Sequence, residues 1–175
     1  MAKIIIGKLE SVKRQTDVAI RLFAENDDPI AVHVLASSAF RILRDLAEKD
    51  DNNFAREKFK TSINPEKENE FWAAFNKCYN FFKHSDRDPT ESICFEEKVN
   101  DYLLFFVCLC WTSLKQNLTK NMICYSSWFI QRHPEMIPDN HILAPFIHNF
   151  NKYDISFISR NEDLQLLNIR LKSNY

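Results

Sequence analysis

Residues 80–89, NFFKHSDRDP, bring an amide, two cations, an imidazole and two carboxylates close together. An imidazole next to an amide and a cation can transfer a proton and hold a phosphate, which is the minimum that acid–base cleavage of RNA requires. The negative end of a helix dipole favours the protonated form of a histidine that ends the helix. We therefore take His84 as a candidate acid or base, with Asn80 as the residue that positions a phosphate.

Nearby cations would complete this candidate site. Helical spacing places Lys77 on the same face as Asn80 and His84, so these three residues form the predicted catalytic set. Lys83 and Arg87 lie close in sequence and are predicted to bind the substrate.

A second polar line precedes this stretch. His33, Ser37, Arg41 and Arg44 recur at helical spacing, and if their helix packs beside the one that ends at His84, they would face the same cleft. His33, Arg41 and Arg44 are therefore further predicted substrate-binding residues. The alternative is a solvated basic face that contacts nothing.

The same cluster also has a structural interpretation. A structural latch, meaning contacts that hold two elements together, would bury His84 and bond it to Asp86, Asp88 or the helix that carries His33. His84, Asp86 and Asp88 also follow a His-x-Asp-x-Asp pattern that suits a hard cation. Asp88 precedes Pro89 and serves as a helix cap, so no metal or cofactor is expected.

The composition limits the classes of protein. A chain of 175 residues is long enough for one domain, and its single glycine excludes phosphate-cradling and dinucleotide-binding loops. A net charge of −1 means that any nucleic-acid contact needs a local basic patch. The longest apolar run, 102–111, is too short for a membrane span. Five cysteines without paired spacing indicate reduced thiols and a cytoplasmic protein.

The elements that must position the cluster are predicted to be helices. Asp28 followed by Pro29, and Thr119, are typical of helix starts. We expect an up-and-down all-α bundle of four or five helices in residues 1–133, and an irregular C-terminal extension in residues 134–175 that packs on it. Residues 50–63 are predicted to be a loop, and 154–159 to be extended. Apolar periodicity predicts helices over about 3–25, 29–49, 65–84, 95–118, 119–132 and 161–171.

The segment NKCYNFFKH, residues 76–84, resembles the signature of the HEPN superfamily of small helical bundles. That signature is an arginine, a short spacer and a histidine on a long helix. The resemblance implies a homodimer in which two such motifs form one metal-independent ribonuclease site. Here Lys77, Cys78 and Tyr79 stand where the arginine is expected, and lysine lacks the two-pronged geometry of a guanidinium.

The stretches DPIAVHVLASSAFRILRDL and NFFKHSDRD also look like segments of a set of uncharacterised bacterial all-α proteins. The predicted function is a non-catalytic binding or interaction module that uses the His84 cluster as a structural latch, with RNA, a nucleotide or a protein as its partner. The alternative is a dimeric, metal-independent ribonuclease, or a toxin or defence component, with His84 as acid or base.

Overall fold

The computed structural model describes residues 3–49, 68–84, 90–134 and 159–173. Every regular element in these ranges is an α-helix, which confirms the predicted all-α class. The predictions for 50–63 and 154–158 fall outside the described residues. The helices are α1 (Lys8–Ala24), α2 (Pro29–Glu48), α4 (Glu68–Phe81), α5 (Val99–Ser113), α6 (Lys120–Arg132) and α8 (Arg160–Lys172).

Two of the helix starts follow the predicted capping residues. The Asp28 carboxylate accepts a hydrogen bond from the backbone N–H of Ile30, and Pro29 occupies the first turn of α2. The Thr119 hydroxyl accepts a hydrogen bond from the N–H of Met122 at the start of α6. Both predictions of a cap are therefore confirmed.

Replacement of Asp28 by alanine is expected to lower the free energy of unfolding by about 1 kcal/mol, because two backbone N–H groups of α2 lose their acceptor. Urea denaturation measures the change. Asp28→Ser keeps an acceptor at this position and should remain close to the wild type. Equal losses in both variants would mean that the cap contributes nothing.

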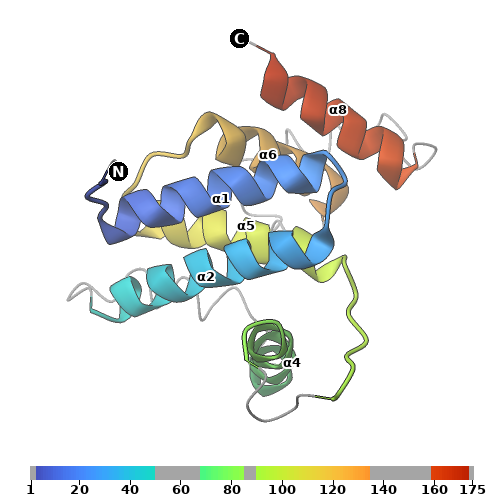
Figure 1. Cartoon of the computed structure of the whole chain (residues 1–175). Coiled ribbons are helices and arrows are strands. Elements are labelled where there is room, and N and C mark those ends of the chain that lie inside the picture. Colours follow the sequence, from blue (N-terminus) through green and yellow to red (C-terminus); the bar gives the residue numbers. More distant parts are fainter. Residues whose placement is uncertain (1–2, 50–67, 85–89, 135–158, 174–175) are drawn as a thin grey trace.

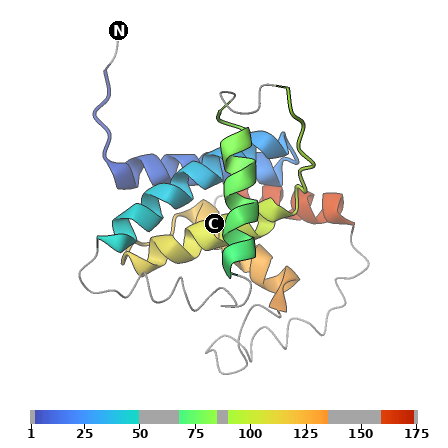
Figure 2. The same cartoon turned by 90° about the horizontal axis from the view of Figure 1, so that it is seen from below.

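The bundle consists of α1, α2, α5 and α6, and α4 lies across it. Figures 1 and 2 show α1 and α2 running in opposite directions, whereas α2 and α5 run in the same direction. Strict up-and-down order is interrupted here, because α4 lies in the connection between α2 and α5 and crosses below α2. The C-terminal half of α4 is therefore held against the bundle from outside.

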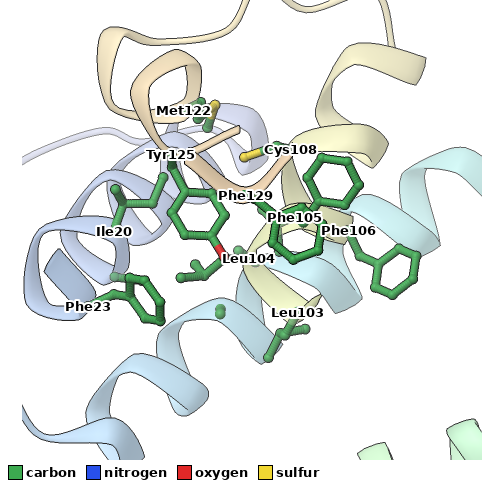
Figure 3. Packing of buried hydrophobic residues seen from close by; sticks show 14 of the residues in the cluster. Ile20, Phe23, Leu103, Leu104, Phe105, Phe106, Cys108, Met122, Tyr125 and Phe129 are labelled. Atoms are coloured by element: carbon green, nitrogen blue, oxygen red, sulfur yellow. The ribbon is translucent and has the colours of Figure 1, made fainter. Parts of the chain in front are cut away.

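The core is centred on α5 and α6. Phe129 is fully buried and stacks on Phe105, with ring centroids 4.2 Å apart. Figure 3 shows Tyr125 beside this pair and near Ile20 and Phe23 of α1. Buried side chains lie all around α5, as expected of a helix that is apolar on every side.

An ion pair between a half-buried arginine and a buried carboxylate joins α8 to α5. The Arg160 guanidinium donates hydrogen bonds to both carboxylate oxygens of Asp101, at 2.7 and 2.8 Å, and the Asp101 side chain is 5 % exposed. The bond to Asp101 raises the pKa of Arg160. The Tyr125 hydroxyl donates to the backbone carbonyl of Asp101 at 2.5 Å, so one residue of α5 anchors both α6 and α8.

A second carboxylate joins α8 to α6. The Trp128 indole N–H donates to Asp163 at 2.7 Å, and Arg132 forms an ion pair with the same carboxylate. Leu164 and Leu167 of α8 are buried in the core cluster that the bundle helices form. The described part of the C-terminal extension therefore shares its core with the bundle.

The five cysteines are free thiols, and only two of them are buried. Cys108 and Cys110 lie in α5, whereas Cys94 is exposed. Burial raises the pKa of each of the two α5 thiols to about 12, so both are neutral packing groups. No helix in the described ranges is long and apolar enough to cross a membrane.

Candidate functional site

His33 of α2 lies where this helix meets the end of α4, and its side chain is fully buried. Its Nδ1 lies 2.9 Å from Oδ1 of Asn100, at the start of α5. The Asn100 Nδ2 group donates to the backbone carbonyl of Pro29 at 2.9 Å, and this bond fixes the orientation of the amide. Because Oδ1 can only accept, His33 carries its proton on Nδ1 in the neutral form.

Two aromatic rings enclose the His33 imidazole. Phe82, one residue beyond α4, meets it edge to face at 5.7 Å, and Phe95, in the segment before α5, does so at 5.1 Å. The two phenylalanine rings also contact each other, with centroids 5.2 Å apart. Burial lowers the pKa of His33, and the bond to Asn100 opposes this effect only in part.

A second contact joins α2 to α4. The Arg41 guanidinium donates to Oδ1 of Asn76 at 2.7 Å and lies 3.8 Å from the ring centroid of Tyr79. Lys83 donates to the Tyr79 hydroxyl at 2.8 Å and lies 4.3 Å from the same centroid. Cations over an aromatic face are attracted to the ring, so Tyr79 holds both Arg41 and Lys83 in place.

The α4 polar face consists of Lys77, Asn80, Lys83 and His84, and all four side chains are exposed. The helix ends here, with the His84 N–H donating to the carbonyl of Asn80 at 2.9 Å. Among the described residues, no side chain is hydrogen-bonded to the His84 imidazole, and none pairs with Lys77. Lys77 and Asn80 lie on α4 as predicted, whereas α4 ends at Phe81, so Lys83 and His84 lie just beyond the helix.

The prediction that a latch would bury His84 is wrong. Two positions along a helix rotate a side chain by about 200°, so Phe82 points toward the bundle while His84 points to solvent. The buried histidine of this region is His33, which fills the structural role predicted for His84. Asp86, Arg87 and Asp88 lie outside the described residues. The substrate-binding role of Arg87 therefore stays a prediction.

The predicted polar line of α2 does not act as one surface. His33 and Ser37 are both buried, so His33 cannot contact a substrate from the surface, and that prediction is wrong. His33 and His84 share no cleft for the same reason. The Arg44 guanidinium lies 3.1 Å from Asp45 and 3.7 Å from Glu48, so neighbouring acids balance its charge. Arg41 reaches Asn76 and Tyr79 of α4, and His33 contacts Phe82 just beyond that helix.

Sequence reasoning missed three residues of this site: Asn100, Phe95 and Tyr79. Asn100 gave a weak signal, because it is a polar residue at the start of the most apolar helix of the chain. Its partner His33 is 67 positions away, and no periodicity within either helix relates them. In the sequence, Tyr79 stands out only as one of the positions where the arginine of the resembled motif is missing.

No metal site is found in this part of the molecule. Within the described ranges, no three His, Cys, Asp or Glu side chains are grouped so that they could hold an ion. The His-x-Asp-x-Asp pattern itself extends into residues 85–89, which the structure does not describe. Comparisons of the chain with known protein families, with curated proteins and with solved structures find no match.

Proposed function

We propose that this protein is a non-catalytic, HEPN-like helical bundle that binds the phosphate backbone of single-stranded RNA through the α4 polar face. The observation that supports this proposal is the charge of that face. Lys77 and Lys83 are exposed, and no carboxylate of the described residues lies within ion-pairing distance of either. Elsewhere, Arg14, Arg44, Arg132, Arg160 and Lys172 are each paired with an acid, whereas the exposed Lys8, Lys13 and Lys115 have no ion pair with a described residue.

The arrangement of α2 and α4 also favours an anionic ligand. Arg41 and Lys83 are held by contacts with Tyr79, so they lose less side-chain freedom on binding than free cations would. Asn80 adds a neutral hydrogen-bonding group between the two lysines of the face. A chain with a net charge of −1 would then owe its RNA binding to this local patch.

The absence of an arginine from positions 77–79, where the resembled motif has one, supports a non-catalytic role. Metal-independent cleavage by the resembled superfamily uses a guanidinium together with the histidine, and Lys77 provides only a point charge. Among the described residues, the guanidinium of Arg41 contacts α4, where it is hydrogen-bonded to Asn76 and lies over the ring of Tyr79. His84 is exposed without a described side chain to orient its imidazole, and catalytic histidines need such a partner.

The test is a binding titration in the presence of chelator, with a labelled single-stranded RNA of about ten nucleotides. The double variant Lys77→Gln/Lys83→Gln is compared with Lys8→Gln/Lys13→Gln, which removes the same charge from exposed positions on α1. We expect the α4 variant to weaken binding by about tenfold and to reduce the salt slope by about 1.4, the value for two phosphate contacts.

Equal weakening by both double variants would contradict the proposal, because binding would then follow total charge. Gels of the same samples report cleavage, and we expect the RNA to stay intact. Cleavage that is lost in His84→Ala would replace the proposal with the dimeric ribonuclease. No RNA binding by the wild type would leave a nucleotide or a protein as the partner.

A further inference from the structure

Helix α8 has apolar side chains on two opposite faces. Leu164 and Leu167 are buried in the core cluster that α8 shares with the bundle. Leu166 and Ile169 are three positions apart, so they are neighbours on the helix surface, and they are 46 % and 64 % exposed. Because successive residues of a helix turn by about 100°, Ile169 points almost directly away from the buried pair. A surface helix usually has a single apolar stripe, so the second face is open to a partner.

The outer apolar face, formed by Leu166 and Ile169, lies at the edge of the molecule. Helix α8 packs on α1 and α6, and Figures 1 and 2 show it on the side of the bundle that is away from α4. The polar residues around this face, Glu162, Gln165 and Arg170, are exposed as well. The face is therefore accessible over about two turns of the helix.

The charges of α8 differ between its two ends. Its first turn contains Glu162 and Asp163, and its last turn contains Arg170 and Lys172. Asp163 is turned toward α6, where it pairs with Arg132, and Lys172 pairs with an acid of α1. Glu162 and Arg170 are therefore the two charged residues of α8 that are open to a second molecule beside the outer apolar face.

These two charged groups are free to form new contacts. Glu162 bonds to Ser159 through Oε2, and its Oε1 forms no hydrogen bond with a described residue. Arg170 has no ion pair with a described residue either. An acid at one end of the face and a base at the other make the face complementary to itself when two such helices run in opposite directions.

We propose that the outer apolar face of α8 binds the same face of a second copy of this chain, with the two α8 helices antiparallel across a two-fold axis. In this arrangement, Leu166 of each copy lies against Ile169 of the other, which removes these side chains from water. Glu162 of each copy lies within one turn of Arg170 of the other, so opposite charges meet at both ends of the contact. Parallel helices would place like charges together at both ends.

The contact is small, so the association is weak and reversible. Two apolar residues per copy cover less than the roughly 1,200 Å² of total area at the low end of specific interfaces. Exposed ion pairs at its ends add little to its strength. We expect mostly monomer at about 5 µM and mostly dimer at about 500 µM.

This dimer differs from the one that the HEPN resemblance implies. That dimer would bring the His84 motifs of two chains together, whereas α4 lies on the side of the bundle away from α8. A contact through α8 therefore leaves the α4 polar faces of both copies on the far sides of the dimer. The inference goes beyond RNA binding and is tested without RNA, so failure of RNA binding would leave it unchanged.

Sedimentation velocity of the full chain between about 5 and 500 µM, at about 0.15 M salt, measures the association. We expect Ile169→Glu to weaken it by at least about tenfold, because the contact would bury a carboxylate. Ile123→Glu makes the same change at an exposed residue of α6 and should associate as the wild type does. Both variants should keep the wild-type melting temperature, since both positions are exposed.

Two results of this experiment would overturn the proposal. One is a wild type that stays monomeric, which would leave another protein or another segment of this chain as the occupant of the face. The other is an equal effect of Ile169→Glu and Ile123→Glu, because association would then not depend on α8.

An exchange of charges tests the antiparallel arrangement. Arg170→Glu and Glu162→Lys each place like charges at both ends of the contact, so each variant alone should associate about fivefold more weakly. An equimolar mixture of the two restores opposite charges at both ends, and heterodimers should form with nearly the wild-type affinity. Two folded variants that fail to recover in the mixture would exclude the antiparallel contact.

A measurement on the wild type keeps the test independent of variant folding. Backbone amide resonances are compared by NMR at about 20 and 500 µM. We expect the shifts that change with concentration to lie in α8, while those of α4 stay constant. Changes concentrated in α4 would show that the chains associate through the other side of the bundle and would overturn the proposal.

Discussion

Arg160→Met is expected to lower the free energy of unfolding by about 2–3 kcal/mol, less than the range of about 3–5 kcal/mol for a fully buried ion pair, because the Arg160 side chain is 32 % exposed. The variant leaves the Asp101 carboxylate 5 % exposed and without its counter-charge. It also removes the connection that holds the start of α8 against α5. Urea denaturation monitored by circular dichroism measures the change, with α8 expected to detach first.

The double variant Arg160→Met/Asp101→Leu provides the diagnostic comparison. It should be more stable than Arg160→Met alone, because an apolar pair avoids the isolated buried carboxylate. Arg170→Met changes an exposed arginine of the same helix and should remain within about 0.5 kcal/mol of the wild type. If the double variant is as unstable as the single one, the loss arises from packing of the arginine stem and not from the buried charge.

Phe129→Ala is expected to lower the free energy of unfolding by about 3–5 kcal/mol. The ring has no solvent exposure, stacks on Phe105 at 4.2 Å and meets the edge of Tyr102 at 5.6 Å. Figure 3 shows it beside Phe105, between α5 and α6. Thermal and urea denaturation should both report the loss.

Two substitutions on α6 calibrate that result. Ile123→Ala removes a side chain that is 52 % exposed and should change stability by less than about 0.5 kcal/mol. Phe129→Leu keeps most of the buried volume and should cost less than Phe129→Ala. Similar losses in Ile123→Ala and Phe129→Ala would contradict the view that the aromatic centre of the bundle carries its stability.

The sequence was informative wherever structure depends on residues close together along the chain. A helix cap is a contact between residues two or three positions apart, so Asp28 and Thr119 could be identified directly. The helix at the C-terminal end was predicted for residues 161–171 and is found at Arg160–Lys172. The start of α1 was set too early: Ile4, Ile5 and Ile6 are exposed and lie before the helix, so no burial stabilises a helical conformation there.

The candidate site was only half predictable. The sequence placed Lys77, Asn80 and His84 on one helical face; in the structure all three are exposed, and His84 lies just beyond the end of α4. It could not tell which histidine is buried, because that depends on how α4 crosses α2. If α4 were turned about its own axis, inward-facing and outward-facing residues would be exchanged. The sequence pattern around His84 does not determine that orientation.

By itself, therefore, the sequence determined the all-α class, several of the helix ends and the location of the polar residues along α4. Only the tertiary structure decided that His33 is buried against Asn100 and that Asp101 binds Arg160, pairs separated by 67 and 59 positions. Helical periodicity reports which residues share a face of one helix. It carries no information about which faces of distant helices meet, since that depends on the packing of the whole core.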